Sequence, residues 1–285
     1  MIHLKAFDQL LNRKPDSPTL FHYTTPGGLI GIVESKSIWA THIRFLNDSM
    51  EFRHALKLAS EVIENLTTAE ENIDRHEGLR RMREGIAGAG INICVASFTE
   101  RGDDLGQWRG YGKSGYALGI PFASLAERAA ATQWLFGPCV YAREAQAELM
   151  KQLLLEVLEL HLQEPKDGEE EDLRRLHSGY PIALYLNSYA PFFKDAAFAE
   201  EREWRLVSRP LSYRHMRMRA GASMLVPYYT YALVGTDTDA IPVESVRVGP
   251  TPDPILAWQG VEALLLGKGL RECVIENSII PYRDW

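Results

Sequence analysis

The stretch from residue 200 to 207, Glu-Glu-Arg-Glu-Trp-Arg-Leu-Val, begins with charged residues, alternates charged and apolar residues over 203–206, and constrains the fold more than any other segment. On an extended backbone, Glu201 and Glu203 point to one side, whereas Trp204 and Leu206 point to the other. We therefore predict that a helix or loop ends here and enters a strand with one charged face and one packed face. Two carboxylates held close together raise each other's proton affinity, which is one origin of acid–base sites. A solvated acidic patch, paired with the two arginines of the stretch, explains the same spacing.

The composition is that of an ordinary globular protein, with 46% hydrophobic and 24% charged residues in a chain of 285. The net charge of -7 argues against a broad basic footprint for duplex nucleic acid, although it is compatible with a local basic groove. We find no signal-peptide pattern and no apolar run of membrane-spanning length, so we expect a cytoplasmic protein without membrane contact. The three cysteines are far apart and lack metal-ligand spacing, which predicts neither a zinc site nor a disulfide framework: Cys94, Cys139 and Cys273.

Strand and helix patterns from both halves of the chain predict a single α+β domain over residues 1–285. Two helices at 143–163 and 171–193, joined by an acidic linker, are interpreted as a helical insert of about 143–195. Helices are further predicted at 2–12, 26–35, about 48–66, 68–86 and 254–266. Strands are predicted at 19–24, 37–41, 91–98, 115–120, 134–141, 217–219, 224–229, 243–248 and 272–276.

A histidine lies at the end of the first predicted strand, directly before a helix. Thr25 suits an N-cap and Pro26 suits the first helical position. Helix N-termini attract anions through their N–H groups and dipole, which makes His22 a candidate binding residue. A buried histidine bonded to the backbone is an equal alternative.

Three polar residues, Asn47, Asp48 and Glu51, open the next predicted helix. The spacing of Asp48 and Glu51 resembles a capping box with Asp in the usual place of Ser or Thr. Alternatively, the three side chains line the same cleft as Glu203.

Polar and aromatic residues cluster after the central buried strand. Ser97 lies near the end of this strand, where binding residues are common. The segment 107–112 then combines Trp108, Arg109 and Tyr111 with two glycines. Aromatic faces can stack on a flat ligand ring and arginine can clamp a phosphate or carboxylate, whereas a packed loop with Trp108 as its plug is the structural alternative.

Seven short motifs, from about residue 20 to the C-terminus, together resemble a large bacterial family of unknown function. They are His22-Tyr23-Thr24, Leu46-Asn47-Asp48-x-x-Glu51, Ser97-Phe98, Gln107-Trp108-Arg109-Gly110-Tyr111-Gly112, Glu201-x-Glu203-Trp204-Arg205, Val248-Gly249-Pro250 and Ser278-x-Ile280-Pro281-Tyr282-Arg283.

The same pattern resembles, more remotely, the ADP-ribosyltransferase superfamily. Its diphtheria-toxin-like branch places His, an aromatic residue and Glu on three core strands, which implies a split β-sheet core with inserted helices. A His-x-Thr before a helix occurs in that branch, including its DNA-modifying toxins, where His contacts the adenosine ribose and the next backbone groups hold the nicotinamide amide. Carried over, His22 and Tyr23 would take these places, with Thr24 beside them, although Tyr23 stands where the family commonly has Gly.

The resemblance also implies roles for the carboxylates. The Glu-x-Glu of other branches resembles Glu201-x-Glu203, whose second Glu would grip the nicotinamide ribose and support an oxocarbenium-like state. A fixed carboxylate stabilises such a developing cation more in the transition state than in the ground state. Either Tyr111 or Tyr116 would stack on the nicotinamide. The remaining implied NAD-binding residues are Asn47, Ser97, Trp108 and, for the diphosphate, Arg109 or Arg219.

We therefore expect an enzyme that consumes NAD as a substrate, either an ADP-ribosyltransferase acting on a nucleic acid or protein or an NAD glycohydrolase. The bacterial family setting suggests an antiphage defence or toxin role with an antitoxin or defence-system partner. A second hypothesis is a metal-dependent hydrolase or nuclease with carboxylate ligands: Asp48, Glu51, Glu201 and Glu203. A third is a non-catalytic nucleotide-binding interaction module.

Overall fold

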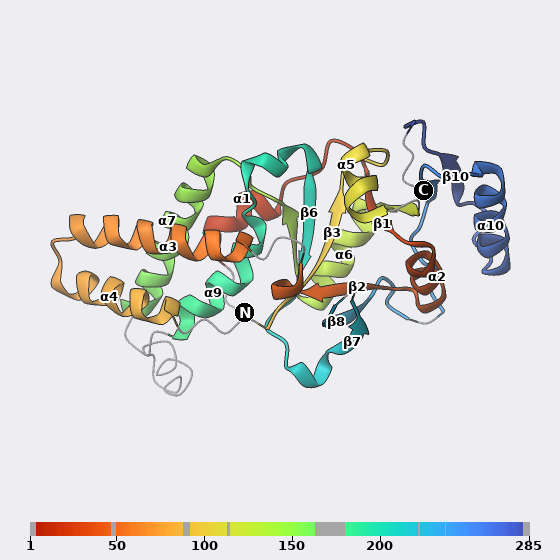
Figure 1. The fold of residues 1–285 in the computed structure, drawn as a ribbon. Helices are drawn as coiled ribbons and strands as arrows, with labels where there is room; N and C mark the ends of the chain where they lie inside the picture. Colours follow the sequence, from red (N-terminus) through yellow and green to blue (C-terminus); the bar gives the residue numbers. More distant parts are fainter. Residues whose placement is uncertain are drawn as a thin grey trace.

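The computed structural model describes residues 4–46, 50–87, 92–112, 115–162, 180–221, 223–236 and 238–281. Within these ranges, the chain is an α+β protein built on one mixed, mostly antiparallel sheet (Figure 1). Its strands are β1 (Thr19–Thr24), β2 (Ser37–His42), β3 (Cys94–Thr99), β4 (Tyr116–Pro121), β5 (Leu135–Pro138), β6 (Glu203–Val207), β7 (Arg217–Ala220), β8 (Leu225–Ala232), β9 (Ser245–Val248) and β10 (Val274–Asn277).

The strand order is β10-β9-β4-β1-β3-β2-β8-β7, while β6 pairs with β3 and also carries β5. Because β6 occupies one edge of β3 from Val95 to Thr99, β1 and β2 must share the other edge. There, β2 pairs with Cys94 and Val95, whereas β1 pairs only with Thr99. The sheet is therefore split along the middle of β3, beside Ser97.

One face of the sheet is an apolar core, as the alternation in β6 predicts. Trp204 and Leu206 lie in this core and are almost fully buried, so the prediction for their side of the strand is confirmed. Three helices contribute to this apolar core and pack against the sheet: α2 (Pro26–Ser35), α6 (Phe122–Thr132) and α10 (Pro254–Gly267). The predicted N-cap of α2 is also confirmed, since the Thr25 hydroxyl accepts a hydrogen bond from the Gly28 amide at 3.2 Å.

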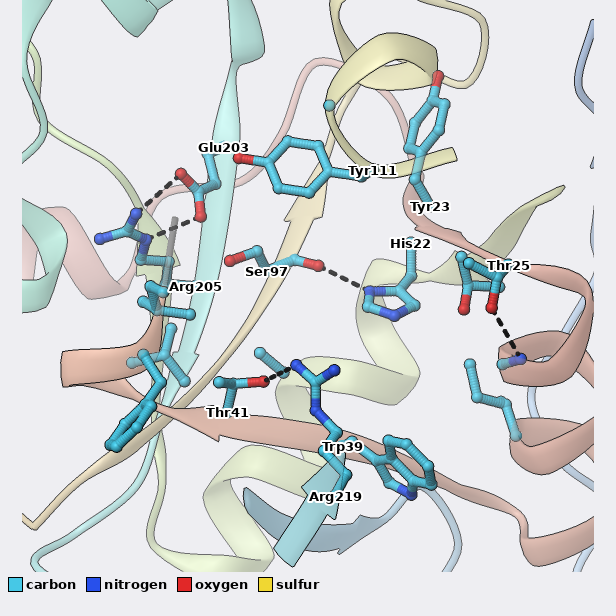
Figure 2. A pocket seen from close by; sticks show the side chains of 18 of the residues that line it. His22, Tyr23, Thr25, Trp39, Thr41, Ser97, Tyr111, Glu203, Arg205 and Arg219 are labelled. Carbon is cyan, nitrogen blue, oxygen red and sulfur yellow. Dashed lines mark hydrogen bonds and ion pairs between the residues drawn. The ribbon is translucent and has the colours of Figure 1, made fainter. Parts of the chain in front are cut away.

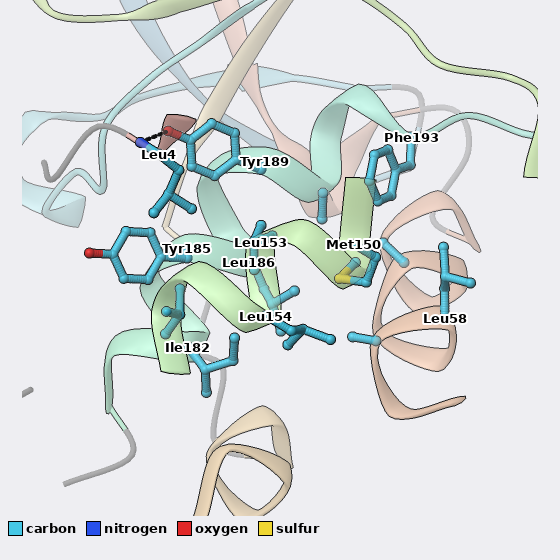
Figure 3. Close-up of a cluster of buried hydrophobic side chains, with 14 of the residues drawn as sticks. Leu4, Leu58, Met150, Leu153, Leu154, Ile182, Tyr185, Leu186, Tyr189 and Phe193 are labelled. Carbon is cyan, nitrogen blue, oxygen red and sulfur yellow. Dashed lines mark hydrogen bonds between the residues drawn. The ribbon is translucent and has the colours of Figure 1, made fainter. Parts of the chain in front are cut away.

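A second apolar core lies among helices on the other side of the molecule (Figures 1 and 3). It is formed by α3 (Met50–Ala69), α4 (Ile73–Ala87), α7 (Arg143–Leu162) and α9 (Tyr180–Tyr189), with the N-terminal α1 (Asp8–Leu11) beside them. Phe7, just before α1, packs its ring 4.3 Å from that of Tyr189. The predicted helical insert thus packs on α3 and α4 instead of standing alone.

Several predicted boundaries shift for identifiable reasons. The helix predicted to run to residue 193 ends at Tyr189, because Pro191 lacks an N–H group, and a 3-10 turn follows over Ala190–Phe192. The loop predicted at 107–112 is helical, with the short α5 (Leu105–Gln107) capped by Asp104 and a π-helical turn at Trp108–Gly112. The capping box predicted at Asp48 and the start of the 171–193 helix lie outside the described residues.

Candidate functional site

A cavity of about 930 Å³ opens where the sheet splits (Figure 2). The wall is formed by the end of β1, the middle of β3, the first turns of α2, the π-helical turn and parts of the strands β2, β6 and β7. The polar and aromatic lining residues include His22, Tyr23, Thr24, Thr25, Trp39, Thr41, Ser97, Tyr111, Lys194, Glu203, Arg205 and Arg219. Segments from sequence positions 22 to 219 therefore converge on one space.

The polar wall of this cavity belongs to a network of four charged side chains, three of which line the cavity. The Lys194 ammonium donates to Glu201 Oε2 at 2.6 Å and to Glu203 Oε2 at 2.5 Å. Arg205 approaches Glu203 from the other side, with Nε 2.8 Å from Oε1 and Nη2 3.1 Å from Oε2. Lys194, Glu203 and Arg205 are 3%, 5% and 3% exposed, so water screens these pairs little.

This arrangement corrects the expectation that the two carboxylates raise each other's proton affinity. Burial alone would raise the pKa of Glu203, but the charges and hydrogen bonds of Arg205 and Lys194 outweigh it and lower the pKa to about 2. Burial would likewise lower the pKa of Lys194, but Glu203 outweighs it and raises that pKa. Glu203 therefore carries its negative charge throughout the physiological pH range and cannot act there as a general acid.

Tyr111 brings an aromatic ring to the same wall. Its phenol oxygen points toward the Glu203 carboxylate in Figure 2, and the ring spans the space between β6 and β1. Burial and the charge of Glu201 raise the pKa of Tyr111, which keeps the hydroxyl protonated. A π-helical turn displaces side chains from regular helical spacing and often marks functional positions, and here it directs Tyr111 into the cavity.

His22 closes the opposite side of the cavity. Its Nδ1 lies 2.9 Å from the carbonyl oxygen of Ser97, in the gap where β1 and β3 no longer pair. Because a carbonyl can only accept, Nδ1 carries the proton and Nε2 is left as an acceptor. Burial lowers the pKa of His22 although the bond to Ser97 opposes this, so the ring is neutral at pH 7. His22 therefore bonds to the backbone, as one of the two alternatives above expects, and also lines the cavity.

Two features give the cavity a positive character. The N-terminal turn of α2 borders it through Thr25, Gly27 and Gly28, and a helix N-terminus favours anions. Arg219 of β7 reaches in from the sheet edge and donates to the Thr41 hydroxyl at 3.4 Å. Its Nε is buried and has no hydrogen-bond partner among the described residues.

Several sequence candidates lie elsewhere. Trp108 is fully buried against Tyr23 at a ring distance of 4.5 Å, which makes it the plug of a packed segment. Tyr23 borders the cavity, but its ring points away from it in Figure 2 and its hydroxyl donates to the Arg101 carbonyl at 2.9 Å. Arg109 is exposed and Tyr116 packs partly against the sheet core, and neither lines the cavity.

Glu201 does not line the cavity: it ends the 3-10 turn Ala196–Glu201, and its carboxylate accepts a hydrogen bond from Lys194, which does line the cavity. Asn47 and Asp48 lie outside the described residues, as does the side chain of Glu51.

Lys194 is the main residue that sequence reasoning missed. Its backbone is fixed by Gln146 of α7, whose buried amide donates to the carbonyls of Val140 and Lys194 at 2.6 and 2.8 Å. A single lysine after a helix forms no sequence pattern from which its place in the cavity wall could be predicted. Arg205 and Trp39 were also missed as cavity residues, although Arg205 shares the strand face of Glu203 and could have been inferred from that alternation.

The described side chains contain no group of three or more His, Cys, Asp and Glu that could hold a metal ion. The ammonium of Lys194 occupies the position between Glu201 and Glu203 that a bridging metal would need. No helix in the described ranges has the length and apolar character required to cross a membrane.

Residues 107–206 match the model of a family described as a protein of unknown function, DUF2971. The matched region contains the π-helical turn with Tyr111, the lysine of the network and β6 with Glu203, whereas His22 and Arg219 lie outside it. Comparisons with curated proteins and with solved structures find no significant match. The match agrees with the predicted resemblance to a family of unknown function over these residues and carries no statement about an activity.

Proposed function

We propose that this protein cleaves the bond between nicotinamide and ribose in NAD and transfers the ADP-ribose to a macromolecule or to water. The observation that carries the proposal is the presence of His22, Tyr111 and Glu203 around one cavity. The ADP-ribosyltransferase resemblance calls for a histidine, an aromatic residue and a glutamate; it places the aromatic residue on a core strand, whereas Tyr111 lies on the π-helical turn. The volume of about 930 Å³ lies within the roughly 300–1,000 Å³ typical of sites for small molecules and cofactors.

The chemistry of the wall suits each part of NAD. Nε2 of neutral His22 can accept a hydrogen bond from a ribose hydroxyl, and the ring of Tyr111 offers a face for nicotinamide. The diphosphate would lie toward Arg219 and the N-terminus of α2, because both favour anions.

Glu203 would act on the ribose. As the C–N bond breaks, its electron pair leaves with nicotinamide and positive charge develops at the ribose carbon. A carboxylate already ionised and fixed by Arg205 stabilises that charge without reorganisation in the transition state. Lys194 and Arg205 hold the Glu203 carboxylate in a fixed orientation but partly neutralise its negative charge. A ribose hydroxyl that donates to Oε2 would compete with the Lys194 ammonium for this oxygen.

Measurement of nicotinamide release by wild type, Glu203→Gln and Glu201→Gln tests the proposal. We expect Glu203→Gln to lower the rate by about 100-fold or more, the effect of losing one preorganised electrostatic group. Glu201→Gln is the matched control, since it removes the other carboxylate of Lys194 but leaves Glu203 in the cavity. It should reduce transfer to an acceptor more than hydrolysis. Thermal melts of all three proteins check that each is folded.

Equal nicotinamide release by wild type and Glu203→Gln would refute the assignment. Loss of release in the presence of a chelator would support the metal-dependent hydrolase instead. Stabilisation of the wild type by NAD without any nicotinamide release would support the non-catalytic nucleotide-binding module.

A further inference from the structure

The segment that leads from Glu203 to the sheet edge has an unusual charge pattern for this protein. Residues 204–236 contain no Asp, Glu or Lys but five arginines, in a chain whose net charge is -7. Arg205 is used inside the ion-pair network. The others, Arg209, Arg214, Arg217 and Arg219, follow it toward β7.

The antiparallel register places part of this charge on the cavity side of the sheet. Arg217 on β7 stands opposite Tyr228 on β8, and Tyr228 stands opposite Thr41 on β2. Residues opposite each other in antiparallel strands point to the same face, so Arg217 shares the face of Thr41, which lines the cavity. Arg219, two residues on, lies on that face as well and enters the cavity. A row of cationic side chains thus runs from the cavity to the edge strand.

These cations are available for a ligand. Arg214 and Arg217 are exposed, and neither forms an ion pair within the described ranges.

Two exposed aromatic rings accompany the arginines. Trp39 is 47% exposed, lines the cavity and packs on Tyr228 with ring centroids 4.6 Å apart. Tyr213 is 54% exposed and stacks on His42, at the end of β2, with ring centroids 6.0 Å apart and planes 12° from parallel. Both rings rest on a second ring, which holds one face in place and leaves surface for another stacking group. Strand side chains alternate, so His42 lies on the core side of β2 whereas Trp39 and Thr41 lie on its cavity side. We call Trp39 and Tyr213, together with Arg214 and Arg217, the basic edge, which spans both sides of the sheet beside the edge strand β7; Arg219 connects it to the cavity.

We infer that the basic edge binds single-stranded nucleic acid and leads it to the mouth of the cavity. Arginines that track phosphates and aromatic faces that stack on unpaired bases are the two components of sequence-tolerant single-strand binding. A duplex keeps its bases stacked inside and requires a broader cationic footprint than a chain with net charge -7 offers. The inference rests on the proposed function only in naming the role of the strand, as the acceptor of ADP-ribose.

A second copy of this chain is a weaker candidate for the same surface. The strand β7 lies at the edge of the sheet and could pair with another β7. Such pairing would bring Arg217 and Arg219 of both copies together, and like charges oppose it.

Fluorescence anisotropy with labelled oligonucleotides of about 16 bases, within the range of single-strand site sizes, tests the inference. The probes are mixed-sequence single-stranded DNA, the equivalent RNA, and the DNA duplex. The variant Arg214→Ala/Arg217→Ala changes two residues outside the cavity lining, and Arg83→Ala/Arg271→Ala removes two exposed arginines elsewhere as a charge-matched control.

We expect wild type and control to bind a single strand at least tenfold more tightly than the basic-edge variant. The slope of log affinity against log salt should become shallower by about 1.4 in that variant, because each phosphate contact on a single strand contributes about 0.7. Nicotinamide release without oligonucleotide should be equal in all three proteins, which separates failure of this inference from failure of the proposed function.

The inference is overturned by the absence of single-strand binding in wild type, by tighter binding of the duplex, or by an equal loss in the control variant. Displacement of the oligonucleotide by polyglutamate at matched charge would assign the surface to an acidic protein instead. A concentration-dependent dimer that Arg217→Ala strengthens would assign it to a second copy.

Discussion

The ammonium of Lys194 lies 2.5 Å from Oε2 of Glu203, and this ion pair is buried in the wall of the cavity. The same ammonium also holds Glu201, and it lies 5.1 Å from the centre of the Phe198 ring. A single cation therefore couples the 3-10 turn before β6 to the carboxylate that faces the cavity.

Replacement of Lys194 by methionine should lower the free energy of unfolding by about 3 kcal/mol, because Glu201 loses its cation and the buried Glu203 carboxylate is left with Arg205 alone. The double variant Lys194→Met/Glu201→Gln should recover part of this loss. Urea unfolding measures both. Lys57→Met is the control, since the Lys57–Glu61 pair is exposed and its loss should change stability by less than about 0.5 kcal/mol. Equal losses for Lys57→Met and Lys194→Met would contradict the role of the buried pair.

Acid should destabilise the protein in part through Glu203. Burial opposes ionisation of Glu203, but Arg205 and Lys194 lower its folded-state pKa to about 2, below the ordinary 4.5. Since the folded pKa is depressed, the stabilisation is complete above the unfolded value and is lost as pH falls from about 5 toward about 2. The stability difference between wild type and Glu203→Gln, from urea unfolding at several pH values, should therefore shrink across this window. A difference that stays constant would show that Glu203 does not titrate in this way.

His22 should be a neutral ring with its proton on Nδ1. Burial lowers its pKa below 6.5, and the Ser97 carbonyl can only accept the Nδ1 proton. Because this folded pKa is lowered, the contribution of His22 to stability is present above pH 6.5 and is lost as pH falls below it. Nitrogen-15 NMR of the imidazole reports the tautomer and the midpoint directly. A midpoint at or above 6.5, or a proton on Nε2 at pH 7, would contradict this arrangement.

Arg219→Ala should weaken NAD binding by about tenfold or more, because arginine is well shaped to clamp a diphosphate. The stabilisation by NAD in a thermal-shift titration should fall accordingly. Arg109→Ala is the matched control: the sequence proposed both arginines for this role, but Arg109 is exposed and lies outside the cavity lining. Its effect should stay within about twofold. A larger loss in Arg109→Ala than in Arg219→Ala would contradict the placement of the diphosphate.

Local patterns were sufficient for much of the fold. The alternation in 203–207 correctly separated Glu203 from Trp204, because strand side chains alternate between faces whatever the strand pairs with. Thr25 and Pro26 correctly marked the start of α2, since a cap depends only on its own turn. The α+β class followed from the same kind of local evidence.

The site itself depended on contacts that no local pattern records. Trp108 and Tyr111 share one aromatic segment, yet a π-helical turn buries the first in a core and sends the second toward the cavity. Lys194 belongs to the site because it contacts Glu203, nine positions later in the chain, at the start of β6.

By itself, the sequence determined which segments form strands and helices and which strand face carries charge, because these follow from spacing of a few residues. Only the tertiary structure decided which charges meet. The side-by-side placement of β1 and β2 on one edge of β3 opened the cavity. Burial of Lys194 and Arg205 beside Glu203 lowered the pKa of this carboxylate, whose proton affinity was expected to rise. Pairing between distant strands and the low dielectric of a buried site are properties of the folded chain, not of any single segment.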